Sequence, residues 1–106
     1  MRILFDQGTP VAIRDALKDH FVRTAYEQGW STLSNGELLE AAEEAGFDVL
    51  LTTDTSLPQQ QNLKGRKLAV VILSKNRWTS IQAKLREIAT AVNSAKPGSC
   101  SVVEIP

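Results

Sequence analysis

The sequence predicts a three-layer α/β/α sandwich around a mainly parallel sheet of about five strands. Short apolar runs alternate with helical patterns along the whole chain, and the runs at 48–53 and 68–73 are almost continuously apolar. This pattern is typical of parallel strands that helices cover on both faces. The chain has 106 residues, of which 42% are hydrophobic and 23% charged, so it is expected to form a single globular domain over residues 1–106.

In the first half of the chain, we expect a strand, a helix, a strand and a helix, at 2–6, 10–18, 21–26 and 35–45. The first strand is an apolar run, and Pro10 suits the first turn of the following helix, with Thr9 as its N-cap. β-branched and aromatic residues favour the second strand. The second helix is expected to begin at a Ser34 or Asn35 cap and to end at Gly46.

In the second half, we expect a strand, a short helix, a strand, a long helix and a strand, at 48–53, 58–63, 68–73, 80–94 and 100–105. The long helix is indicated by Ile81, Leu85 and Ile88, which recur at steps of four and three residues. Thr79 or Ser80 is its expected cap. Helices and strands thus alternate to the end of the sequence, which supports a parallel sheet.

The overall charge argues against a protein that binds nucleic acid through bulk positive charge. The net charge is zero and the isoelectric point is about 6.6, so bulk charge does not favour nucleic-acid binding, and any such contact must come from a local patch.

The single cysteine, Cys100, cannot form an internal disulfide, which fits a reducing compartment. No apolar run is long enough for a signal peptide or a membrane span. We therefore expect a cytoplasmic protein without membrane contact.

Acidic residues follow two of the expected strands. Asp6 ends the first strand and Asp54 follows the third, while Glu37 lies in the first turn of the helix that leads into the third strand. Open parallel sheets bind ligands outside the carboxyl ends of their strands. If the strands are parallel, the side chains of Asp6 and Asp54 share one edge with Lys75, Asn76 and Arg77, which follow the fourth strand.

This set of side chains suggests metal-assisted chemistry. Carboxylates that lie close together repel one another, and a bound divalent cation removes this repulsion. Mg²⁺ or Mn²⁺ prefers oxygen ligands and keeps several waters, and it can acidify a water for attack on a phosphodiester. Asp6, Glu37 and Asp54 are therefore the candidate metal ligands and catalytic residues. Lys75, Asn76 and Arg77 are the candidate phosphate-binding residues.

Each of these residues also has a structural alternative. Asp6 would cap the following helix, and Asp54 would shape a turn, because Asp readily bonds its own backbone. Glu37 forms a capping-box pattern with Ser34. Lys75 and Arg77 would be solvated loop charges. The sequence alone leaves these alternatives open.

The chain resembles the PIN-like domains, and more narrowly a small bacterial PIN-like family of unknown function. The resemblance is carried by RILFDQGTP at 2–10, GWSTLSNGELLEAAEEAGFDVLLTTDTSL at 29–57 and QNLKGRKLAVVILSKNRW at 61–78. It implies an α/β/α sandwich and, in active members, a metal-dependent ribonuclease. Many such proteins are toxins that a partner antitoxin protein holds inactive, and homodimers are common among them.

The resemblance assigns the first-strand acid to Asp6 and the T-x-D-type acid to Asp54, within Thr52-Thr53-Asp54, and it retains Glu37. At three further positions relatives often have acids, and this chain has neutral residues: Gln7, Asn35 and Ser56. Fewer negative ligands lower metal affinity, although amide oxygens still coordinate metals. The sequence therefore leaves two hypotheses, an RNA-cleaving enzyme that uses Mg²⁺ or Mn²⁺ and an inactive binding module on the same scaffold.

Overall fold

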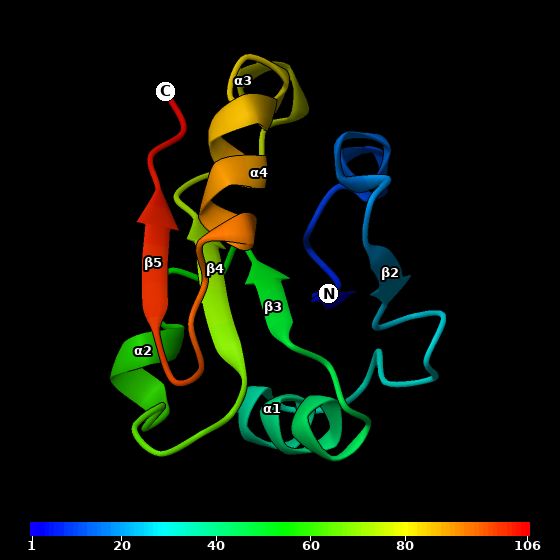
Figure 1. Ribbon diagram of the computed structural model, residues 1–106, viewed down its shortest axis with the longest axis vertical. Coiled ribbons are helices and arrows are strands. Elements are labelled where there is room, and N and C mark those ends of the chain that lie inside the picture. Colours follow the sequence, from blue (N-terminus) through cyan, green and yellow to red (C-terminus); the bar gives the residue numbers. More distant parts are fainter.

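The fold is built on a single sheet of five parallel strands. The computed structural model describes all 106 residues. The strands are β1 (Arg2–Phe5), β2 (Phe21–Thr24), β3 (Val49–Thr52), β4 (Ala69–Leu73) and β5 (Cys100–Val103). Their order across the sheet is β2-β1-β3-β4-β5, and every pair is parallel (Figure 1). The predicted α/β fold is thus confirmed.

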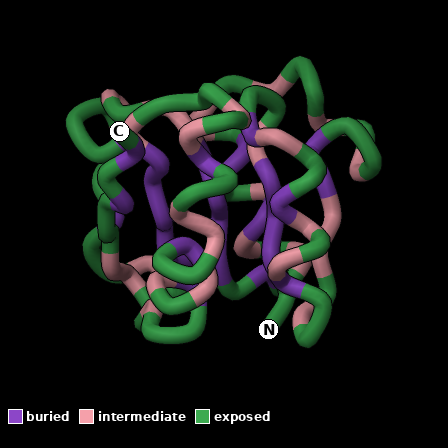
Figure 2. Tube along the Cα trace, turned by 90° about the horizontal axis from the view of Figure 1, so that it is seen from above, coloured by how far each residue is buried: buried purple, intermediate pink, exposed green.

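Helical segments cover both faces of the sheet. They are the 3-10 helix η1 (Val11–Leu17) and the α-helices α1 (Asn35–Glu44), α2 (Leu57–Gln60), α3 (Trp78–Gln82) and α4 (Leu85–Asn93). Hydrophobic residues of η1, α3 and α4 pack in one cluster with Phe5 and Leu51, whereas those of α1 and α2 pack in a second cluster with Leu4 and Leu50. Successive strand residues point to opposite faces, so each apolar run supplies both cores (Figure 2).

The connection from β4 to β5 differs in hand from the other three. β1 connects to β2 across the face that η1 covers, and the next two connections run in the opposite direction across the face of α1 and α2. The connection from β4 to β5 crosses the sheet in the same direction as these two. Its helices, α3 and α4, lie on the opposite face, the one that η1 covers (Figure 1). The hand of this connection is therefore opposite to that of the others. Right-handed connections are strongly preferred in such sheets. Here the exception places α3 and α4 over strands that η1 alone would leave uncovered.

The boundaries of two helices differ from those expected. Thr9 does not cap η1, because its hydroxyl donates to the carbonyl of Leu51 at 3.0 Å and Pro10 occupies the cap position. The expected helix over 80–94 is two helices, since the chain leaves helical geometry at Lys84. Arg77 precedes α3 in an extended conformation, so neither Thr79 nor Ser80 is its cap. Ile81, Ile88 and Val92 are fully buried on either side of the break, and Leu85 is half-buried.

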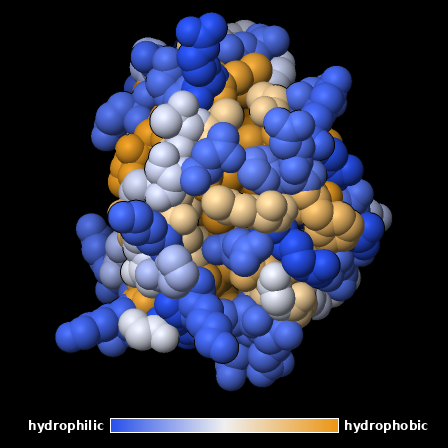
Figure 3. All heavy atoms as spheres, viewed as in Figure 1, coloured by the Kyte–Doolittle hydropathy of each residue, from blue (hydrophilic) through white to orange (hydrophobic).

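The surface on the α4 side of the sheet is mainly hydrophilic, with hydrophobic atoms visible along the β5 side (Figure 3). Val102 of the edge strand β5 is among the chain's exposed large hydrophobic residues. None of the helices combines the length and the hydrophobicity that a membrane crossing would need.

Candidate functional site

The two strand-terminal acids lie at the carboxyl edge of neighbouring strands. In the pairing of β1 with β3, Phe5 lies opposite Leu51, and the backbone N–H of Asp6 donates to the carbonyl of Leu51 at 3.0 Å. After β1 the chain continues to η1 on one face of the sheet, and after β3 it continues to α2 on the opposite face, so the direction of the connections reverses between these neighbouring strands. Such a reversal is where open α/β sheets form a ligand-binding crevice. Asp6 and Asp54 follow the two strands that form this switch point.

The loops that follow these two strands are in close contact. Gly8 lies so near the β3 loop that a Cβ atom in its place would be 3.0 Å from the Thr53 hydroxyl oxygen. A side chain at position 8 would therefore require the Thr53 hydroxyl to shift. The absence of a side chain at Gly8 helps to hold the loops of Asp6 and Asp54 together.

Thr52 links the two acids directly. Its hydroxyl donates to Asp6 Oδ2 at 2.7 Å and accepts from the backbone N–H of Asp54 at 3.0 Å. The residue is fully buried, and a buried hydroxyl is expected to be fully hydrogen-bonded. One side chain therefore sets the position of both the Asp6 carboxylate and the Asp54 backbone. The sequence signal for this role is a polar residue at the end of an apolar strand, just before an acid.

Asp6 is half-buried and open to solvent on one side. Its Oδ1 accepts the backbone N–H of Gln7 at 2.7 Å, so the carboxylate is held by its neighbour and by Thr52. It accepts no N–H from η1, which removes the helix-capping alternative. Asp6 also lines a hollow of about 500 Å³ over the ends of β1 and β2. A ligand can therefore reach this carboxylate.

Asp54 is held more tightly. Its Oδ1 accepts the backbone N–H of Ser56 at 3.0 Å and the Ser56 hydroxyl at 2.6 Å, which is the turn geometry expected of Asp. Its Oδ2 accepts from Asn35 Nδ2 at 2.7 Å. These neutral donors, first the Ser56 hydroxyl and then Asn35, lower the pKa of Asp54 below its ordinary value. The carboxylate is therefore charged at neutral pH and accepts three hydrogen bonds.

Glu37 does not join the two aspartates. It forms a capping box at the start of α1, in which its Oε1 accepts the backbone N–H of Ser34 at 2.9 Å. This bond to the Ser34 backbone is the main reason that the pKa of Glu37 lies below its ordinary value. No group of three or more His, Cys, Asp or Glu side chains is arranged to hold a metal ion. The expected ligand set of three acids is therefore not assembled.

The Glu37→Gln variant separates capping from metal binding. Gln also suits this position of a capping box, so we expect the melting temperature to stay close to that of the wild type. If Glu37 acts only as a cap, the metal-dependent activity of the variant should also be unchanged. Thermal denaturation and a metal-dependent RNA cleavage assay provide the two readouts. A loss of cleavage with unchanged stability would show that Glu37 contributes to the site.

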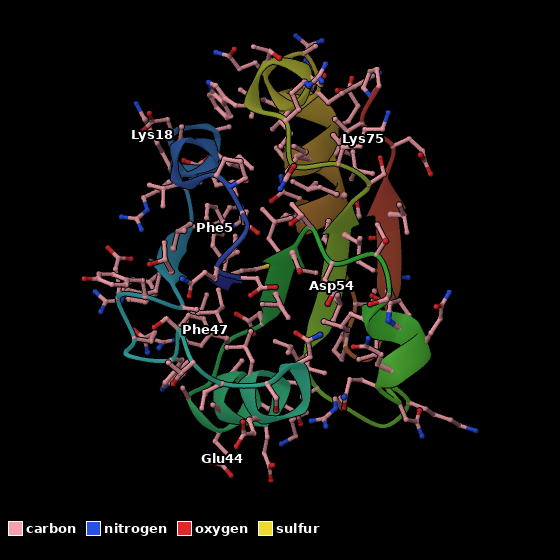
Figure 4. All side chains as sticks on the ribbon, turned by 180° about the vertical axis from the view of Figure 1, so that it is seen from behind. Phe5, Lys18, Glu44, Phe47, Asp54 and Lys75 are labelled. Carbon is pink, nitrogen blue, oxygen red and sulfur yellow. The ribbon has the colours of Figure 1, made fainter.

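The predicted phosphate-binding residues form a separate group. Lys75, Asn76 and Arg77 are exposed and line a second hollow together with Pro106. Figure 4 shows Lys75 beyond the end of β4, well separated from Asp54. The two cations form no ion pair, because the chain's ion pairs join Arg14 to Glu27 and Arg66 to Glu43. These residues share the carboxyl edge of the sheet with the acids, but they line a different hollow.

Gln7 lines the same hollow as Asp6, but the sequence did not indicate that Arg14 and Glu27 also line it. Arg14 of η1 donates to Glu27 Oε1 at 2.6 Å, and Glu27 also accepts the backbone N–H of Thr24 at 2.9 Å. The bond to the Thr24 backbone and then the bond to Arg14 lower the pKa of Glu27 below its ordinary value. These residues come from separate segments, so no local motif identifies them.

Few residues at this edge could serve as ligands of a small divalent cation. Asp6 and Asp54 provide two carboxylates at one edge, and Mg²⁺ is commonly held by one or two carboxylates. Asn35 now donates to Asp54 and to Gln60 Oε1 at 3.2 Å through its Nδ2, and its Oδ1 makes no hydrogen bond. A rotation of this amide would present an oxygen in place of the donor. The carboxylates and Asn35 are thus the residues that would hold a cation.

Removal of the Thr52 hydroxyl should loosen the site. We expect Thr52→Val to lower the free energy of unfolding by about 1–3 kcal/mol, because the Asp54 N–H loses its buried partner. Thr52→Ser keeps the hydroxyl and should preserve more of both stability and metal-dependent activity. Urea denaturation of the two variants measures the difference. Equal stability of Thr52→Val and Thr52→Ser would show that the Thr52 hydroxyl does not stabilise the carboxyl edge of the sheet.

Comparison with known proteins adds no relative: no protein-family model, no curated protein and no solved structure matches this chain.

Proposed function

We propose that this protein is a ribonuclease of the PIN-like type that uses Mg²⁺ or Mn²⁺, with Asp6 and Asp54 as the metal-binding carboxylates. The observation that supports this most is the single buried hydroxyl of Thr52, which joins the Asp6 carboxylate to the Asp54 backbone at 2.7 and 3.0 Å. A fixed pair of acids at the switch point of a parallel sheet is a suitable cation site.

The residues around the cation have separate tasks in this proposal. Asp6 would bind the cation from the side of the hollow, where the RNA enters. Asp54 and Asn35, which are hydrogen-bonded to each other, would bind it from the opposite side. Thr52 is a positioning residue that keeps the two aspartates in register. The bound cation would neutralise the acids and acidify a water for attack on a phosphodiester. Glu37 is left to its capping role in this account.

The basic test is cleavage of single-stranded RNA by the purified protein. We expect cleavage in Mn²⁺ or Mg²⁺ and none in EDTA. Several unrelated RNA sequences should be used, because the site does not define a sequence preference. Intact RNA under every metal condition would contradict the proposal.

A binding module without catalysis is the second candidate, and the contacts of Asp54 favour it. The carboxylate already has three neutral donors, from Ser56 and Asn35, and so needs no cation for its hydrogen bonds. Positions 7, 35 and 56 are also neutral, where relatives often have acids. RNA binding without cleavage in any metal would support this candidate over the enzyme.

A further inference from the structure

The hollow that contains Asp6 has an unusual exposed aromatic residue at its rim. Tyr26 lines this hollow and is 77% exposed, the highest value among the chain's exposed large hydrophobic residues. Val11, on the same hollow, is 56% exposed. Single exposed hydrophobic residues are common, but Tyr26 and Val11 line one hollow together with the Asp6 carboxylate.

The turn that carries Tyr26 is firmly anchored. The backbone N–H of Ala25 donates to the carbonyl of Phe5 at 2.8 Å, which ties the turn to the end of β1. The Thr24 hydroxyl accepts the backbone N–H of Glu27 at 3.0 Å, and Glu27 in turn pairs with Arg14. Both residues next to Tyr26 are therefore fixed. The backbone that carries the ring is therefore ordered before a ligand binds, which lowers the entropy cost of binding.

The other partly exposed aromatic residues of the chain do not offer such a ring. Trp30 is half-buried and packs edge-on against Phe47, with ring centroids 6.1 Å apart. Trp78 packs against the core on the α4 side of the sheet. Phe21 is exposed, but it lies at the amino edge under the Arg2 guanidinium. Tyr26 is thus the free aromatic side chain at the carboxyl edge.

We propose that Tyr26 is a stacking platform for a nucleobase of the single-stranded RNA whose phosphodiester reaches Asp6. This inference rests on the proposed function and specifies how its substrate is held. Aromatic stacking suits single strands because every base has a π-face. The hollow offers phosphate no unpaired cation, because Arg14 is paired with Glu27 and Asp6 adds a negative charge. Base stacking, and not ionic attraction, must therefore supply the binding. Binding should therefore be tolerant of sequence and weakly dependent on salt.

The test measures binding without cleavage. A fluorescently labelled ten-nucleotide RNA is titrated with the wild type and three variants in EDTA, and anisotropy gives the dissociation constants. Tyr26→Ala should weaken binding about tenfold, within the range expected for one base stack. Tyr26→Phe keeps the ring and should bind like the wild type. Phe21→Ala removes an exposed aromatic from the opposite edge and should leave binding unchanged.

The outcomes separate this inference from the proposed ribonuclease activity. Weakened binding by Tyr26→Ala, with no cleavage by the wild type in metal, would support the platform and overturn the enzyme. Cleavage by the wild type with unchanged affinity of Tyr26→Ala would overturn the platform alone. A wild type that binds no RNA in EDTA, or an equal loss in Tyr26→Ala and Tyr26→Phe, would also overturn the platform.

Discussion

Replacement of Asp6 by Asn is expected to reduce metal-dependent RNA cleavage by about 100-fold or more, because even the groups that support a metal ligand cost 10–100-fold when removed. The same change should leave the melting temperature close to that of the wild type. Asn retains one side-chain oxygen, which can accept from Thr52 or Gln7. The variant thus removes a charged ligand and keeps much of the local hydrogen bonding.

Asp15→Asn is the matched control for this experiment. Asp15 is an exposed acid on η1, and the same chemical change there should alter neither cleavage nor stability. Cleavage is measured as initial rates at saturating Mn²⁺, and stability by thermal denaturation. Full activity of Asp6→Asn would remove Asp6 from the catalytic site. A large fall in melting temperature would instead indicate that the acid has a structural role.

Phe5→Ala is expected to have the largest effect on stability, about 3–5 kcal/mol of unfolding free energy. Phe5 is fully buried at the end of β1, directly before Asp6 (Figure 4). Truncation of its ring would leave a cavity between the sheet and the helices on the α4 side. The carbonyl of Phe5 also accepts from Ala25, so the cavity lies beside the turn that carries Tyr26.

Phe21→Ala is the control, because Phe21 is half-exposed on the neighbouring strand β2. Its ring contacts the Arg2 guanidinium, whose central carbon is 4.8 Å from the ring centroid. Loss of an exposed contact of this kind costs about 0.5–1 kcal/mol. Urea denaturation of both variants gives the comparison. Similar losses for the two variants would mean that the cavity at Phe5 collapses after truncation.

Much of the fold could be predicted from local pattern. The continuous apolar runs identified β3 and β4 within one or two residues, because strands covered on both faces have no polar alternation. The order of the strands in the sheet was not predictable, because a run of five apolar residues does not indicate which strands pair with it. The break at Lys84 in the helix expected at 80–94 was not predictable, because the apolar spacing of Ile81, Leu85 and Ile88 continues across it.

The candidate site was predicted in part. A parallel sheet requires that Asp6 and Asp54 share one edge, and the structure has them there. Glu37 had two roles open in the sequence, and the structure shows its capping box. Thr52 and Tyr26 were missed as site residues, because their contacts depend on strand pairing and on turns that bring distant segments together.

The most direct test of the account is where Mn²⁺ binds, observed through its paramagnetic broadening of backbone amide signals in nuclear magnetic resonance spectra of the wild type. At low Mn²⁺, the signals of Gln7 and Ser56 should weaken first, because each amide donates to one of the two proposed ligands. The Asp6→Asn variant should lose this selective effect. Broadening centred on other acids, or no selective broadening at any Mn²⁺ concentration, would contradict a shared cation between Asp6 and Asp54.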